Sequence, residues 1–185
     1  IQFWYKESIL IMLKSNNKLN SILVLALAIL ALSFTRLIPH PWNFSPMIAA
    51  GIFAGFYFRH FYLGSFVIIL SMFLGDLFLG FHNTMFFTYI SLAIVVLAGI
   101  YLKSLKFKNI LYSTLASSIV FFIITNFGAW LTLDMYSKDL NGLMQSYTMA
   151  IPFLQNTLVS TFVYLYIFKT LFEFALKKKI LNTSF

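Results

Sequence analysis

Leu111–Leu131, "LYSTLASSIVFFIITNFGAWL", is a run of 21 consecutive residues without a charged side chain. A helix of this length rises about 30 Å, which matches the hydrocarbon core of a bilayer. Similar apolar runs are "SILVLALAILALSF" from Ser21, "FVIILSMFLGDLFLG" from Phe66, "MFFTYISLAIVVLAGIYL" from Met85 and "TLVSTFVYLYIF" from Thr157. Together these runs predict a multi-pass membrane protein.

The composition supports this prediction. Of 185 residues, 61% are hydrophobic and 10% are charged, against roughly 45–50% and about 25% in soluble domains. The ten-residue alternation that is typical of an outer-membrane barrel is missing, so the spans should be α-helices. We expect an all-α bundle of six transmembrane helices, at Leu19–Thr35, Pro46–Phe58, Tyr62–Leu79, Met85–Leu102, Ile110–Leu131 and Pro152–Leu176.

The second of these helices is short. Its 13 residues rise about 20 Å, which is less than the hydrocarbon thickness of about 30 Å. It must therefore be tilted, extended or sheltered by its neighbours.

The distribution of charge predicts the orientation and the domain boundaries. The formal net charge is +8, and lysines and arginines near span ends favour the cytoplasm. With both termini inside, only Arg36 and Lys138 lie outside, while the cytoplasmic side holds Lys6, Lys14, Lys18, Arg59, Lys103, Lys106, Lys108, Lys169, Lys177, Lys178 and Lys179. We therefore expect a cytoplasmic segment at 1–18, a transmembrane domain at 19–176 and a basic cytoplasmic tail at 177–185. Residues 1–11 precede Met12 and are interpreted as an over-extended reading frame.

Several classes of function are disfavoured. No basic stripe with interleaved aromatic residues lies outside the apolar runs, so nucleic acid is not an expected partner. The chain has no cysteine, which removes disulfides and thiolate sites. The short motifs of zinc proteases, serine hydrolases, P-loop ATPases and dinucleotide-binding enzymes are missing. We expect neither an enzyme nor a protein with a cofactor or its own energy source.

Asp76 is the most unusual residue, because it lies inside an apolar run. A carboxylate at the centre of a membrane helix costs about 2.5–3.5 kcal/mol on insertion scales, which makes such a residue a functional candidate. Arg36, at the end of the first helix on the same side of the membrane, is the expected ion-pair partner. Such a pair could be structural, or it could orient the guanidinium toward an anionic group of a ligand.

The connection Leu37–Pro46, "LIPHPWNFSP", lies on this outer side. Ser45 and Pro46 fit the cap and the first residue of the next helix. His40 and Asn43 have no such role. The stretch is therefore either a bent connector or one wall of a pocket.

Two polar stripes recur at intervals of four residues, so each shares one helical face: Asn126, Trp130 and Asp134, and Asn156, Ser160 and Tyr164. Such stripes more often form interhelical hydrogen bonds than ligand contacts. Between them, Leu140, Leu143, Met144 and Tyr147 have helical spacing and predict a short amphipathic helix, which is either a lid or an interfacial helix.

These residues form the predicted site, an outward-facing pocket lined by Arg36, His40, Asn43, Asp76, His82, Asn126, Trp130, Tyr147 and Asn156. A metal site at His40, His82 and Asp76 is less favoured, because lone histidines in membrane loops more often form hydrogen bonds. An intramembrane enzyme would need Asp76 and His82 to meet, and the helix would have to break after Gly80 for this. A scaffold protein whose polar outer face docks another protein is the main alternative.

Five segments resemble one family: "TRLIPHPWNFSPMIAAGIFAG", "DLFLGFHNTMFFTY", "TNFGAWL", "GLMQSY" and "AIPFLQNTLVST". It is an uncharacterised family of bacterial multi-pass membrane proteins, described as candidate transport proteins, and the resemblance covers about Lys18 to Leu171. The family pattern corresponds here to Arg36, Pro39, His40, Pro41, Asn43, Pro46, Asp76, Gly80, His82, Thr84, Tyr89, Asn126, Gly128, Trp130, Gly142, Tyr147, Pro152, Phe153 and Asn156.

In size and layout the chain is also similar to the substrate-binding S components of energy-coupling-factor transporters, by analogy of fold. This similarity implies uptake of a small molecule or micronutrient from the outer face of a bacterial cytoplasmic membrane. A separate ATPase and coupling subunit would then supply the energy. The alanine-rich docking surface of such components is only loosely matched by Ala26, Ala28 and Ala31.

Overall fold

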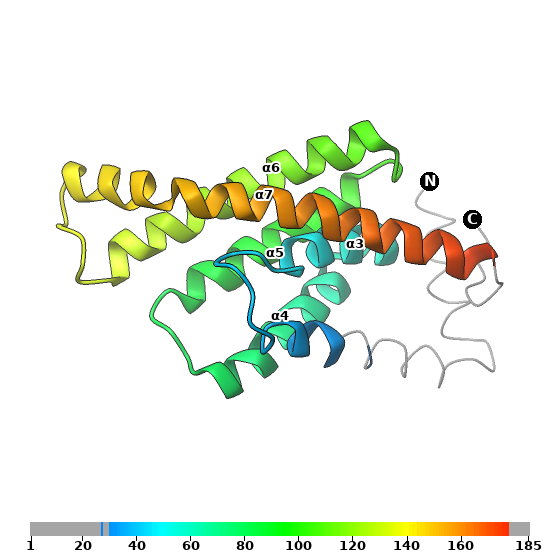
Figure 1. Cartoon of the computed structure of the whole chain (residues 1–185), viewed down its shortest axis with the longest axis horizontal. Helices are drawn as coiled ribbons and strands as arrows, with labels where there is room; N and C mark the ends of the chain where they lie inside the picture. Colours follow the sequence, from blue (N-terminus) through cyan, green and yellow to red (C-terminus); the bar gives the residue numbers. More distant parts are fainter. Residues whose placement is uncertain (1–26, 28–29, 178–185) are drawn as a thin grey trace.

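The computed structural model describes residue 27 and residues 30–177, and it is helical as the sequence predicts (Figure 1). Residues 30–35 are helical and lead into the first connection. The helices that follow are Met47–Phe58 (α3), Phe61–Leu79 (α4), Met85–Tyr101 (α5), Phe107–Thr132 (α6) and Leu140–Lys177 (α7). No strand occurs among the described residues.

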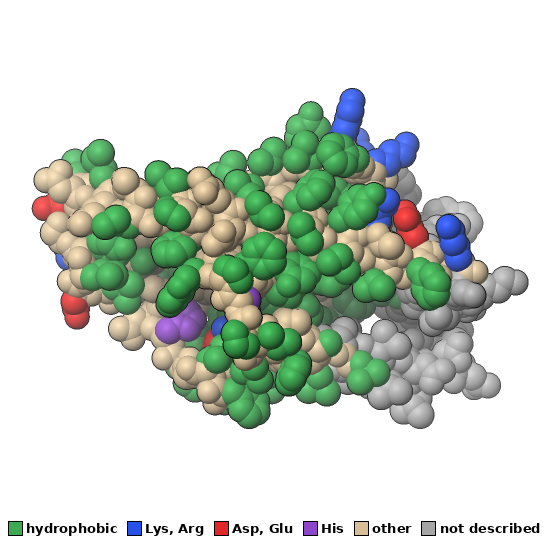
Figure 2. All heavy atoms as spheres, viewed as in Figure 1, with side chains coloured by type: hydrophobic (Ala, Val, Ile, Leu, Met, Phe, Trp, Pro, Cys, Tyr) green, Lys and Arg blue, Asp and Glu red, His purple; other side chains and the backbone are tan. Residues whose placement is uncertain are grey.

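Three helices, α4, α6 and α7, are long and apolar enough to cross a membrane, while α3 and α5 are shorter apolar helices. Large hydrophobic side chains cover much of the surface (Figure 2). Both features are typical of a membrane protein, whose outer surface faces lipid rather than water. The predicted segment 1–18, the start of the first helix and most of the basic tail lie outside the described residues.

The short helix α3 is sheltered by its neighbours. It contacts α4, α5, α6 and α7, and eight of its twelve residues are buried. Its most extensive contact is with α5, where glycines bring the two backbones together. A Cβ atom at Gly55 would lie 2.1 Å from the Val96 carbonyl oxygen, and one at Gly99 would lie 1.9 Å from that of Ile52. Small residues allow such close helix approach within a membrane.

Helix α7 corrects one prediction. The expected short helix around Leu140–Tyr147 and the expected last span from Pro152 are one continuous helix of 38 residues with Pro152 inside it. The buried positions Ser146, Ala150, Thr157, Thr161 and Leu165 follow one another at helical spacing on both sides of the proline. The proline removes one backbone donor, a loss that packing against a neighbouring helix tolerates. Helix α7 contacts α6 and α3.

The helices alternate in direction, so the molecule has two distinct ends (Figure 1). One end carries the α3–α4 and α5–α6 connections and the end of α7; we call it the basic end, because it holds Arg59, Lys103, Lys106, Lys108, Lys169 and Lys177. Blue side chains gather there in Figure 2. The opposite end carries the connections 36–46, 80–84 and 133–139, and with them Asp134 and Asp139.

Candidate functional site

The expected ion pair between Arg36 and Asp76 is present at the end opposite the basic end. Arg36 Nη2 lies 2.6 Å from Asp76 Oδ1, and the two side chains are 14% and 1% exposed. The other carboxylate oxygen, Oδ2, accepts a hydrogen bond of 2.5 Å from the Tyr89 hydroxyl. The buried Asp76 carboxylate therefore accepts a bond on each oxygen, one from Arg36 after the first helix and one from Tyr89 on α5.

Backbone groups of α4 complete this cluster. Arg36 Nη1 donates to the carbonyl oxygen of Met72 at 2.7 Å, and the Ser33 hydroxyl donates to that of Ser71 at 2.9 Å. Gly75 leaves the space for the guanidinium, since a Cβ atom there would lie 2.5 Å from Arg36 Nη1. A guanidinium has five donor hydrogens, and within the described residues Nη1 and Nη2 each donate one bond, so the group has the capacity for a further acceptor.

Two backbone carbonyl groups of the connection Leu37–Pro46 accept hydrogen bonds from side chains of α7. Asn156 Nδ2 donates to the Trp42 carbonyl oxygen at 2.9 Å, and the Ser160 hydroxyl donates to that of Asn43 at 3.4 Å. Asn43 has a positive φ of 58°, a conformation that asparagine adopts more readily than most residues. The predicted stripe of Asn156, Ser160 and Tyr164 therefore contacts this connection, where Tyr164 packs edge-on to Phe44.

His40 and His82, which lie at the end opposite the basic end, each form a hydrogen bond with a residue one or two positions further along the chain. His40 Nδ1 lies 2.9 Å from the Pro41 carbonyl oxygen, and His82 Nδ1 lies 2.8 Å from the Thr84 hydroxyl. Both side chains are exposed. Helix α4 ends before Gly80, which has a φ of 92°. Within the described residues, no group of three or more His, Asp or Glu side chains could hold a metal ion.

The remaining predicted residues lie on the α6–α7 hairpin, in the half that is nearer its connecting turn. Tyr147 donates to the Ile123 carbonyl oxygen at 2.9 Å, and Trp130 Nε1 donates to that of Ser137 at 2.9 Å. Asn126 bonds within its own helix, to the Phe122 carbonyl oxygen. The predicted stripe ends early, because α6 stops at Thr132 and Asp134 lies beyond the helix.

Asp139 caps the start of α7 at this turn. Its Oδ1 accepts hydrogen bonds of 2.8 Å from the Gly142 backbone N–H and from the Ser137 hydroxyl. These bonds favour the charged carboxylate, the Gly142 bond most of all, and they lower the pKa of Asp139 below its usual value of 3.8. Sequence reasoning did not identify this cap.

The nine predicted site residues thus lie in four separate places. Arg36 and Asp76 form the buried cluster, and His40, Asn43 and Asn156 lie along the first connection. Asn126, Trp130 and Tyr147 lie on the α6–α7 hairpin, and His82 lies in the α4–α5 turn. The predicted pocket omitted Tyr89 and Gly75. Tyr89 could have been found, because α4 and α5 are joined by a short turn, and Asp76 and Tyr89 stand at similar distances before and after it.

Comparison with known proteins places the chain in one family. The model of a family described as "Family of unknown function (DUF6580)" matches residues 16–183. No curated protein and no solved structure matches the chain.

Proposed function

The chain belongs to this family of unknown function, and from its buried ion pair we propose that it is the substrate-binding component of a membrane transport system. It takes up a small molecule or micronutrient from the extracytoplasmic side. The single observation that carries this proposal is the cluster of Arg36, Asp76 and Tyr89. Ionisable residues within membrane helices are costly and mark substrate or ion pathways by default.

The chemistry of the cluster favours a ligand that carries an acceptor group. Asp76 is bound on both oxygens, so it positions Arg36 rather than contacting the ligand. The Arg36 side chain retains 14% exposure, and its unused donors suit a carboxylate, phosphate or carbonyl group. Binding, release and conformational change are all that these residues need to perform, so we propose no covalent chemistry and no enzymatic activity.

The orientation supports uptake from outside. Six described lysines and arginines lie at the basic end, and such residues favour the cytoplasmic side. The cluster at the opposite end would then face outward, in a bacterial cytoplasmic membrane. We propose six spans with both termini in the cytoplasm, as in S components of energy-coupling-factor transporters, with an ATPase and coupling subunit as partners.

The connection Leu37–Pro46 is the element we propose to move. It joins the helix that ends just before Arg36 to α3. It contacts α7 through two carbonyl oxygens and through two ring pairs, Trp42 with Phe153 and Phe44 with Tyr164. Breaking the two hydrogen bonds and separating the two ring pairs would free the connection from α7. Capture of a ligand at Arg36 would precede closure of this connection, followed by rocking of the bundle.

The test is mass spectrometry of small molecules that remain bound through gentle purification. The informative variant is Arg36→Gln with Asp76→Asn, which removes both charges and so avoids leaving one buried charge unpaired. We expect this double variant to fold and to lose the molecule that the wild type retains. A double variant that retains it equally would refute the assignment, and a stoichiometric protein partner without any small molecule would favour a scaffold instead.

A further inference from the structure

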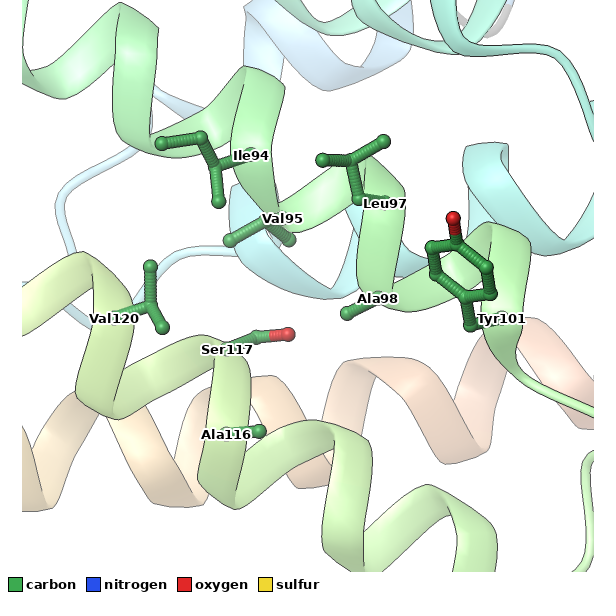
Figure 3. A pocket seen from close by; sticks show the side chains of 8 residues that line it. All are labelled: Ile94, Val95, Leu97, Ala98, Tyr101, Ala116, Ser117 and Val120. Atoms are coloured by element: carbon green, nitrogen blue, oxygen red, sulfur yellow. The ribbon is translucent and has the colours of Figure 1, made fainter.

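A groove lies between α5 and α6, next to the connection at the basic end (Figure 3). Its volume is about 200 Å³, and its walls are mainly the aliphatic side chains of α5 from Ile94 to Ala98 and of α6 from Ala116 to Val120. Ile94 and Leu97 are each 38% exposed. The groove therefore opens onto the surface that faces lipid in a membrane-spanning orientation.

One polar side chain faces this apolar groove without a partner. Ser117 lines it and is 2% exposed, and its hydroxyl has no hydrogen-bond partner among the described residues. Figure 3 shows the side chain extending from α6 into the space between the two helices. A buried hydroxyl without a partner is unfavourable, so the groove suits a ligand that is apolar and carries one acceptor.

Three lysines lie in or next to the α5–α6 connection, just beyond the end of the groove that Tyr101 lines. Tyr101, which is 80% exposed, ends α5, and Lys103, Lys106 and Lys108 follow within seven residues, all exposed. None of the three lysines forms a salt bridge within the described part of the chain. An exposed tyrosine beside lysines is typical of the level of lipid headgroups.

We propose that this groove binds an anionic glycerophospholipid. An acyl chain fills the aliphatic part, an ester carbonyl accepts the Ser117 hydroxyl hydrogen, and the phosphate lies against Lys103, Lys106 and Lys108. The order of the groups agrees with the spacing of the residues. Ala98, which lines the groove together with Ser117, lies three residues before α5 ends at Tyr101, a helical rise of about 4.5 Å, and Lys103 follows two residues later in the connection.

The same chemistry disfavours a helix of another protein as the occupant. An apolar helix face brings no anionic group to the three lysines. A phospholipid supplies an apolar chain, an acceptor and a phosphate in one molecule, and basic sites between helices on the cytoplasmic side are known to bind such headgroups.

The test is native mass spectrometry of the full chain in detergent, with phosphatidylglycerol or phosphatidylcholine of identical acyl chains. We expect phosphatidylglycerol to be retained and phosphatidylcholine to be retained several-fold less. Lys103→Gln should weaken retention of phosphatidylglycerol about fivefold, whereas Lys177→Gln, at the same end on α7, should leave it unchanged. Equal retention of the two lipids, or equal effects of the two lysine variants, would overturn the proposal.

The hydroxyl has its own matched control. Ser117 and Ser118 are adjacent, both are buried, and both hydroxyls lack a partner among the described residues, but only Ser117 lines the groove. Ser117→Ala should weaken retention about threefold to tenfold, and Ser118→Ala should not. Equal retention by the two variants would overturn the ester contact, and a second polypeptide bound in place of lipid would overturn the site.

Discussion

Breaking the ion pair of Arg36 and Asp76 from one side should destabilise the fold more than removing both charges. Arg36→Gln leaves the Asp76 carboxylate, which is 1% exposed, without a cation and with the Tyr89 hydroxyl as its remaining native donor among the described residues. Loss of one partner from a buried pair costs about 3–5 kcal/mol. Asp76→Asn should cost less, about 1.5–3 kcal/mol, because Arg36 is partly exposed and keeps its bond to the Met72 carbonyl oxygen.

The double variant Arg36→Gln/Asp76→Asn leaves no charge in the cluster, and two amides can still form hydrogen bonds. We therefore expect it to be more stable than Arg36→Gln alone, so that the two single effects do not add. The assay is unfolding by denaturant in mixed micelles, followed by circular dichroism. The two single variants and the double variant form a double-mutant cycle, which measures the coupling energy of the pair. The matched control is a double-mutant cycle at Lys169 and Glu173, an i,i+4 pair at 3.6 Å, where the coupling energy should be about 0.3–0.5 kcal/mol. Additive losses at Arg36 and Asp76 would refute the reasoning.

Three further predictions concern packing, titration and orientation. Gly55→Ala should lower the free energy of unfolding by about 1–3 kcal/mol, because the new Cβ atom would lie 2.1 Å from the Val96 carbonyl oxygen. Gly51→Ala should lower it less in the same unfolding assay, because the nearest contact of its Cβ atom is 3.1 Å to a Val95 methyl group. The lowered pKa of Asp139 means that its cap stabilises the start of α7 above pH 3.8 and is lost as the pH falls through the lowered value. The amide chemical shift of Gly142 should therefore titrate below pH 3.8 in the wild type and not in Asp139→Asn, and a midpoint at or above 3.8 would contradict the cap. Since the chain has no cysteine, Lys106→Cys should react with a membrane-impermeant thiol reagent only from the cytoplasm and Asn141→Cys only from outside; the reverse pattern would invert the orientation.

The helices themselves were largely predictable from the sequence. The observed bounds of α3, α4 and α5 differ from the predicted ones by one residue at each affected end, and α6 begins three residues earlier than predicted. Apolar runs of this length have one stable form in lipid, because every backbone group must be bound within the segment. Among the described helices, the large error was the break at Pro152, where local preference pointed to a helix start, while packing against α6 kept α7 continuous.

The site was predictable only in part. Arg36 and Asp76 could be paired because a lone carboxylate in an apolar helix needs a cation, and Arg36 follows the first helix on the same side of the membrane. Tyr89 could have been inferred from its distance to the α4–α5 turn. Gly75 and the Met72 carbonyl oxygen could not be assigned to the pair, since the sequence does not state which face of α4 the guanidinium meets. The separation of the nine predicted residues into distinct groups was likewise invisible, because sharing one end of a bundle does not imply contact.

Composition and periodicity within single segments are enough to predict that this protein is helical, apolar over most of its length and basic at alternate connections. They do not predict which helices touch, that α3 is sheltered by its neighbours, that the first connection contacts α7, or that a groove with one buried hydroxyl lies near three lysines. Lipid constrains each backbone locally, whereas close approach between helices depends on small residues and polar groups that match across different segments.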